Sequence, residues 1–134
     1  MKPADRYFYP AVFTYVDGEE IAVTFPDLDV ATCGTDDSDA LLSARELLGL
    51  TLFGLEEDGE PIPAPTPLQD LRLEAGETAV LVDVYMPSVR MAQENRSVSR
   101  TVTLPAWLNA AAMERNVNFS QVLQEALRAR LSLT

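Results

Sequence analysis

The sequence contains no histidine and a single cysteine in 134 residues. Histidine is the commonest general base and metal ligand near neutral pH, so its absence removes the usual centre for that chemistry. The one cysteine, Cys33, has no partner for an internal disulfide, which fits a reducing compartment. Without a histidine to activate the thiol, Cys33 is better explained as a small strand residue than as a nucleophile.

Long apolar runs are missing as well. No stretch approaches the length that crosses a bilayer, and the first residues lack the apolar core of a signal peptide. No glycine-rich phosphate loop precedes a helix either. We therefore expect a cytoplasmic protein.

Basic residues are scarce, and they are unevenly distributed. The net charge of −11 would argue against a nucleic-acid binder if the charges were spread evenly. Residues 1–85, however, carry 4 Lys/Arg against 18 Asp/Glu, a balance of −14, whereas residues 86–134 carry 6 Arg against 3 Glu, a balance of +3. This asymmetry indicates two modules with different partners, an acidic module for something cationic and a basic module for a polyanion.

The last third of the chain predicts one strand followed by two helices. Polar and apolar residues alternate over 97–104, and the spacing changes to three and four at Pro105, which fits the first turn of a helix. That helix is expected to end near Asn116. Asn118 can cap a second helix over about 119–131, with Gln121 in the capping-box position.

This C-terminal unit is too small to bury a core alone, because a strand and two helices of about forty residues hide too little surface. We expect two copies to pair their strands antiparallel and form a dimer. The apolar side chains would then face inward: Val98, Val102, Leu104, Trp107, Leu108, Ala111, Leu123, Ala126 and Leu127. The polar ones, Ser97, Ser99, Thr101 and Thr103, would point outward on a ribbon narrow enough for a DNA major groove.

Arg100 does not fit this alternation simply, because it occupies one of the alternate positions, with Val98 and Val102, whose side chains should face inward. Either it lies at the edge of the ribbon and reaches toward phosphate, or the register is shifted by one residue. The sequence leaves both possibilities open.

The first part of the chain predicts three strands in succession. Residues 7–16 and 20–25 are rich in aromatic and β-branched side chains, and Asp17-Gly18 between them is a strong hairpin signal. Residues 31–34 can add a short third strand.

A helix and a last strand follow. Asp36 can cap an amphipathic helix over 37–57, whose broad apolar stripe suits a position across a sheet. Alternate prolines make residues 60–67 a stiff, extended connection. The apolar run over 78–85 predicts a largely buried strand. This order implies a three- or four-stranded sheet with one helix across it.

Two carboxylates, Asp27 and Asp29, follow the second strand and could hold a divalent metal for phosphoryl chemistry. A two-metal site needs acids that converge from several elements, and Asp83 is the only acid in the last strand. Exposed turn carboxylates are therefore the simpler interpretation, and a degenerate nuclease ranks third among our hypotheses.

The N-terminal and C-terminal parts both resemble the HicB antitoxin family. The N-terminal segments are YPAVF, IAVTFPDLDVATCGTD and GLEEDGEPIPAP, and the C-terminal segments are ENRSVSRTVTLPAWLN and NVNFSQVLQEAL. The C-terminal part also resembles the ribbon-helix-helix DNA-binding fold. The resemblance implies an α+β protein with a partial ribonuclease-H-like domain over 1–85, a linker over 86–96 and a dimeric ribbon-helix-helix domain over 97–134.

The same resemblance implies an antitoxin without enzymatic activity, metal or cofactor. Its acidic domain would bind and neutralise a HicA-type mRNA-cleaving toxin by covering the surface that holds RNA phosphates. Toxin contacts are expected at Phe25, Asp27, Leu28 and Asp29. As a dimer, the protein would bind operator DNA and repress its own operon through Arg96, Ser97, Ser99, Arg100, Thr101, Thr103, Asn118 and Ser120.

A stand-alone transcriptional regulator is the alternative function. In that case the N-terminal domain would sense a small ligand. A short basic reading frame beside the gene would favour the antitoxin, and its absence would favour the regulator.

Overall fold

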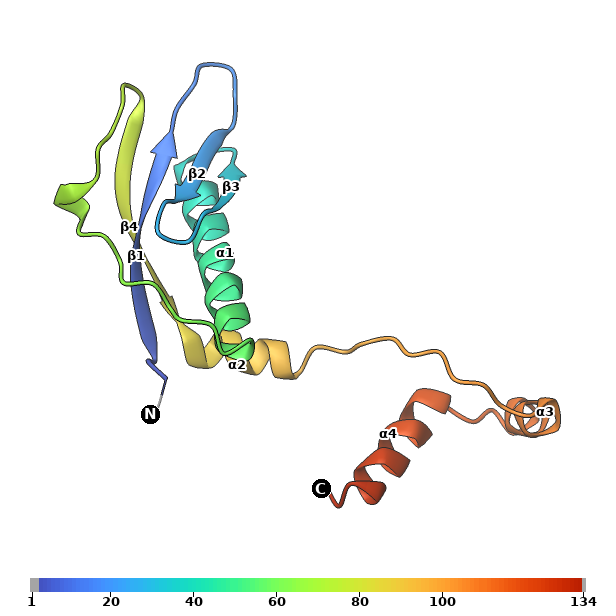
Figure 1. Cartoon of the computed structure of the whole chain (residues 1–134). Coiled ribbons are helices and arrows are strands. Elements are labelled where there is room, and N and C mark those ends of the chain that lie inside the picture. Colours follow the sequence, from blue (N-terminus) through green and yellow to red (C-terminus); the bar gives the residue numbers. More distant parts are fainter. Residues whose placement is uncertain (1–2, 134) are drawn as a thin grey trace. The chain divides into compact units, whose positions relative to one another are not determined.

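The computed structural model describes residues 3–133, and the chain divides into two units between Arg96 and Ser97. The N-terminal unit holds a four-stranded sheet, two α-helices and a short 3-10 helix, and the C-terminal unit holds two α-helices (Figure 1). Helices are thus combined with an antiparallel sheet, as the sequence predicted.

Four antiparallel strands form the sheet in the order β3-β2-β1-β4. They are β1 (Arg6–Thr14), β2 (Ile21–Phe25), β3 (Val30–Gly34) and β4 (Glu77–Tyr85). The predicted turn joins β1 to β2, and in it Gly18 has a φ of 78°, a left-handed value that glycine adopts without strain. The predicted sheet is therefore confirmed.

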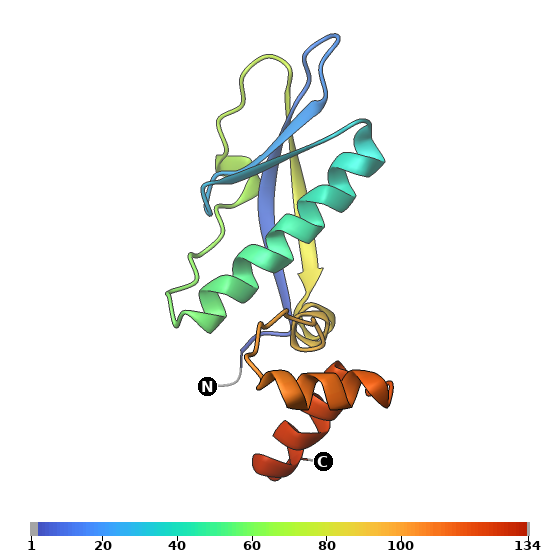
Figure 2. The same ribbon diagram turned by 90° about the vertical axis from the view of Figure 1, so that its right-hand side faces the viewer.

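The helix α1 (Asp37–Glu57) lies across one face of the sheet (Figure 2). Asp36 caps its start as predicted, because the Asp36 carboxylate accepts a hydrogen bond of 2.8 Å from the amide of Asp39. The core between helix and sheet comes from alternate strand residues and one stripe of α1. Its members include Tyr9, Ala11, Phe13, Ile21, Val23, Phe25, Ala40, Ala44, Leu48, Leu52, Val82 and Val84.

Strand β4 is less buried than the sequence predicted. Val82 and Val84 are buried in the core, but Leu81 is 50% exposed and Tyr85 is also exposed. The reason is its position, since β4 is an edge strand and successive side chains point to opposite faces of the sheet. An apolar run cannot reveal by itself that one of those faces is open.

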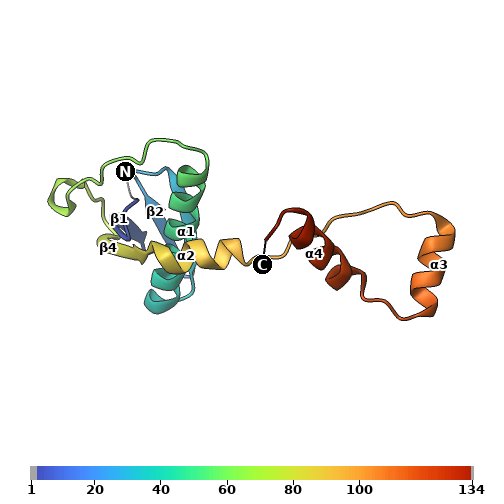
Figure 3. The same cartoon turned by 90° about the horizontal axis from the view of Figure 1, so that it is seen from below.

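Residues 86–94 form the helix α2 (Met86–Glu94), where we predicted the first part of a linker. The helix continues from the end of β4 (Figure 3) and contacts α1. Met86 is fully buried, and Val89 packs against the core. Arg90 pairs with Glu56 of α1, with 2.7 Å between Nη2 and Oε2. The linker prediction is therefore wrong for these residues, which belong to the N-terminal unit.

The proline-rich segment 60–67 has neither helix nor strand, as predicted, and hydrogen bonds fix it to the sheet. The hydroxyl of Tyr9 donates to the carbonyl of Pro63. The Asp27 carboxylate accepts two hydrogen bonds from Thr66, one of 3.0 Å from the amide and one of 2.6 Å from the hydroxyl. The chain then passes through the 3-10 helix η1 (Leu68–Asp70) to β4.

The C-terminal unit contains α3 (Ala106–Glu114) and α4 (Phe119–Arg130). Pro105 precedes the first helical residue of α3, which ends slightly earlier than predicted. Asn118 caps α4 as predicted, because its side chain accepts a hydrogen bond of 3.1 Å from the amide of Gln121. Residues 97–105 have neither helix nor strand in the single chain. The strand expected over 97–104 would pair with a second chain, so it stays a prediction.

Candidate functional site

The eight residues predicted to contact DNA are all exposed. Arg96 ends the N-terminal unit, and the other seven belong to the C-terminal unit. Two of these, Arg100 and Ser120, come together at one pocket.

That pocket, of about 290 Å³, lies between residues 100–104 and α4. Its walls are Arg100, Val102 and Leu104 from the segment, and Phe119, Ser120, Val122, Leu123 and Ala126 from the helix. Arg100, Val102 and Leu104 therefore share one side of the segment, which is the alternation expected of a strand. Arg100 lies on the apolar side of the segment in the single chain, and its register in a paired strand stays a prediction.

The C-terminal unit has no core of its own. Across α3 and α4, which are described in full, no residue is buried. Trp107 is 71% exposed and Leu127 is 51% exposed. Other large apolar side chains of the unit are also exposed, namely Val98, Val102, Leu104, Leu108, Met113, Phe119, Val122, Leu123, Leu131 and Leu133. This amount of open apolar surface is typical of an interaction site.

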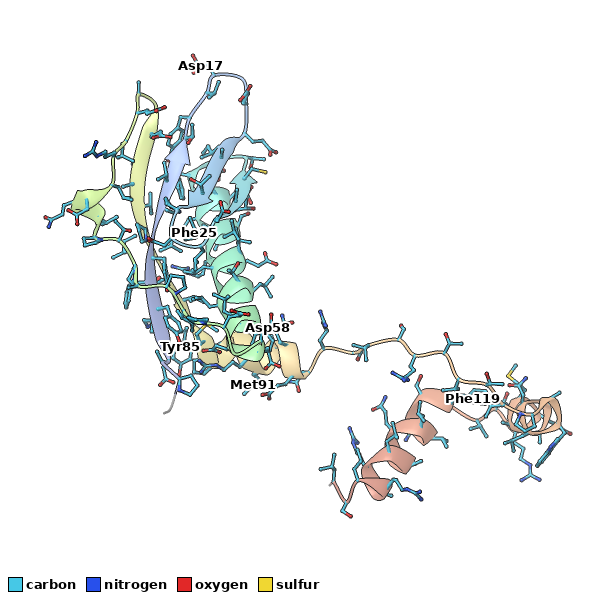
Figure 4. The ribbon with its side chains drawn as sticks, viewed as in Figure 1. Asp17, Phe25, Asp58, Tyr85, Met91 and Phe119 are labelled. Atoms are coloured by element: carbon cyan, nitrogen blue, oxygen red, sulfur yellow. The ribbon has the colours of Figure 1, made fainter. Side chains whose placement is uncertain are left out.

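The four residues expected to contact a toxin have different environments. Phe25 is fully buried inside the N-terminal unit (Figure 4), so its side chain is not available to a partner. Leu28 is half-buried and packs against the core. The Asp27 carboxylate binds Thr66, which makes it a support for the proline-rich segment. Asp29 is exposed in a turn with a φ of 53°.

A larger pocket of about 500 Å³ opens between α1, the end of β4 and α2. Its lining is mostly apolar and consists of Leu42, Arg45, Glu46, Leu50, Val84, Tyr85, Ser88, Val89, Ala92 and Gln93. We call it the α1–α2 groove. The sequence interpretation missed it because the groove requires α2. Leu42 and Leu50 were nevertheless a signal, since both are large apolar residues of α1 that its own unit leaves exposed.

Charged groups at one end of this groove are paired. Arg45 donates to Asp83 twice, at 3.0 Å to the carboxylate and at 3.1 Å to the backbone carbonyl. Arg6 donates to the same carboxylate at 2.6 Å and lies over the ring of Tyr85, 5.2 Å from its centroid. The hydrogen bond from Arg6 lowers the pKa of the Asp83 carboxyl, helped by Arg45 and opposed by partial burial. Asp83 therefore ties together β1, β4 and α1.

Comparison with solved structures gives two similar chains. The first, in a toxin-antitoxin complex from Streptococcus pneumoniae, is 28% identical and has a TM-score of 0.62 over 93% of this chain and 99% of that one. The second is the antitoxin HicB of Burkholderia pseudomallei, 23% identical, with a TM-score of 0.55 over 90% of this chain and 96% of that one. The chain has the fold of a HicB antitoxin. The HicB resemblance seen in the sequence is confirmed at this level, although the sequence matches no family model and no curated protein.

The environment of Cys33 is not that of an activated nucleophile. Cys33 is exposed in β3, and a hydrogen bond with Glu20 raises the pKa of its thiol, the opposite of what a nucleophile needs. Within residues 3–133, no group of three or more His, Cys, Asp or Glu is arranged to hold a metal ion. In the same range, no helix has both the length and the apolar character of a membrane span.

Proposed function

We propose that this protein is an antitoxin that binds and neutralises a HicA-type, mRNA-cleaving toxin and, as a dimer, binds operator DNA to repress its own operon. Its fold is that of HicB, and one of the similar structures is a toxin-antitoxin complex. On this proposal the N-terminal unit is a partial ribonuclease-H-like domain that acts by binding, and the C-terminal unit is a ribbon-helix-helix domain.

The acidic charge of the N-terminal part supports a basic partner. Residues 1–85 carry a balance of −14. A toxin that cleaves RNA must hold phosphates with basic groups, so an acidic protein surface can take the place of the RNA and can also accelerate encounter. Neutralisation would then follow from the toxin's RNA-binding surface being covered.

The exposed apolar surface of the C-terminal unit is the observation that carries the dimer proposal. Trp107 and Leu127 are each more than half exposed, and no residue in the fully described α3 and α4 is buried. Burying a large apolar side chain stabilises a protein by about 1.5–3 kcal/mol, so a unit of this kind folds stably only when something covers it. A second copy brings the same apolar faces and can cover them symmetrically.

The segment 97–104 provides the part of the dimer that would contact DNA. Val102 and Leu104 lie on the side facing α4. If two such segments pair antiparallel, Ser99, Thr101 and Thr103 lie on the opposite face of the ribbon and can reach base edges. Ser97 belongs to the same polar face.

Phosphate contacts would flank this ribbon. Arg96 and Arg100 supply positive charge. The start of α4, at Asn118 and Ser120, presents backbone amides at the positive end of a helix dipole. Together these groups would position the ribbon, while the hydroxyl side chains would read sequence.

Three measurements test the proposal. Light scattering of the purified protein should give at least a dimer, and Leu127→Glu should convert it to a monomer, while Leu81→Glu on the N-terminal sheet should not.

Thr101→Ala combined with Thr103→Ala should weaken operator binding in an anisotropy titration without changing the dimer. A toxin encoded by the adjacent reading frame should lose its RNA-cleaving activity when mixed with an equimolar amount of the protein. A monomeric wild type, or a toxin that stays active, would refute the corresponding half of the proposal.

A further inference from the structure

The α1–α2 groove has the geometry of a helix-binding site. Leu42, Glu46 and Leu50 are spaced four residues apart, so they form a ridge along the exposed side of α1. On the other side, Ser88 and Ala92 of α2 are also four apart, and their small side chains leave room for close approach. A third helix can place its own ridge between these two rows.

The openness of the groove favours a helix over a small molecule. Leu42 is 62% exposed, Leu50 is 45% exposed and Tyr85 is also exposed, so the lining does not close over its contents. Small-molecule sites bury most of the ligand surface, roughly 70–90% for a drug-sized compound. An elongated amphipathic helix needs only one apolar face covered, which this groove can do.

The charges around the groove favour a basic partner. The guanidinium of Arg45 is already paired with Asp83. Glu46 is exposed in the middle of the α1 ridge and makes no ion pair with any other described residue. The groove therefore offers one free carboxylate among apolar side chains, on a unit whose first 85 residues carry a balance of −14. A Lys or Arg on the edge of a docking helix would complement it.

We infer that the α1–α2 groove is where this protein holds its toxin, by taking an amphipathic, basic helix of the toxin between α1 and α2. This inference rests on the proposed antitoxin function and assigns its surface. It replaces the toxin contacts that we expected at Phe25 and Asp27, since Phe25 is buried and Asp27 is bonded to Thr66. The apolar face of the bound helix would cover Leu42 and Leu50.

The test compares full-length variants for binding to the toxin of the adjacent reading frame by calorimetry. Leu42→Lys and Leu50→Lys should each weaken binding by at least about tenfold, because they place a charge of the partner's own sign in an apolar contact. Leu81→Lys is the matched control, since Leu81 is similarly exposed, at 50%, but is not among the residues that line the groove. It should bind within about threefold of wild type, as expected for an exposed residue outside the contact. Glu46→Lys should weaken binding more at low salt than at high salt.

A protection experiment checks the result without charge changes. In a Cys33→Ser background, Ser88→Cys introduces a thiol into the groove. Toxin should slow alkylation of that thiol by at least about tenfold, because a closed interface excludes the reagent. Suppose that the wild type binds the toxin, the groove variants bind it equally well, and the toxin does not protect the thiol. The groove assignment would then be wrong, and the antitoxin function would still stand. Failure of the wild type to bind the toxin at all would overturn both.

Discussion

Two glycines of α1, Gly49 and Gly54, differ in how closely neighbouring side chains approach them. A Cβ at Gly54 would meet no described atom within 4 Å, whereas a Cβ at Gly49 would lie 2.9 Å from Cγ2 of Val89 and 3.2 Å from Cγ2 of Val84. Both glycines are in the interior of a helix. Alanine therefore gains a similar helix propensity at each site, roughly 1 kcal/mol, and the difference between the two variants isolates the cost of the contact.

The expected difference follows from the stiffness of the neighbours. Val84 and Val89 are β-branched, so their side chains have little freedom to move away from a new methyl group. Overpacking of this kind costs about 1–3 kcal/mol. Gly54→Ala should raise the free energy of unfolding by roughly 1 kcal/mol. The free energy of unfolding of Gly49→Ala should be lower than that of Gly54→Ala by about 1–3 kcal/mol. Gly49→Ala should therefore be no more stable than wild type.

Urea unfolding followed by circular dichroism measures this difference in the full-length protein. In a thermal scan, 1 kcal/mol corresponds to about 4–8 °C for a domain of 60–100 residues, so the two variants should be resolved clearly. If Gly49→Ala were stabilised as much as Gly54→Ala, then α2 would not pack against α1 as the structure shows. The α1–α2 groove would then lack its α2 wall as well.

Three further predictions concern single side chains. Arg90→Ala should lower the free energy of unfolding by about 2 kcal/mol in urea titrations, because it removes charged hydrogen bonds to the largely buried Glu56. Asp83→Asn should be less stable than wild type at neutral pH and should converge with it below the ordinary carboxyl pKa of 3.8, because the hydrogen bond from Arg6 lowers the pKa of Asp83 and its stabilisation disappears as the pH falls. Unchanged curves for either variant would contradict the ion pairs. Asn118→Ala should cost about 1 kcal/mol through loss of the α4 cap, visible as reduced helical dichroism on heating.

Local signals in the sequence were sufficient to predict most elements of the N-terminal unit. The turn at Gly18, the cap at Asp36 and the apolar stripe of α1 each act over a few residues, and each is present in the structure. They specify elements and their order. They do not specify which strand is at an edge, and for that reason the burial of β4 was overestimated.

Helix α2 could not be predicted in the same way. It is nine residues long, and isolated helices of that length are marginal in water. Burial of Met86 and the pairing of Arg90 with Glu56 hold it in place, and both depend on residues about thirty or more positions away in the chain. The groove beside α2 escaped prediction for the same reason.

The predicted toxin contacts show a different limit. Phe25, Asp27, Leu28 and Asp29 are adjacent in the sequence and were treated as one turn. In the structure a strand end and a turn give them separate roles, with Phe25 in the core and Asp27 bonded to Thr66. Phe25 therefore shares no exposed surface with its neighbours, and contacts at Asp27, Leu28 and Asp29 stay a prediction.

The absence of a core from α3 and α4 has a consequence for regulation. If two chains must meet before this unit is covered, its folding is bimolecular and depends on protein concentration, whereas the core under α1 is complete within one chain. On the proposed function, dilution or proteolysis of the separated C-terminal units would remove operator binding first and leave toxin binding by the N-terminal unit intact. The operon would then be released for new synthesis while the protein already present still bound the toxin.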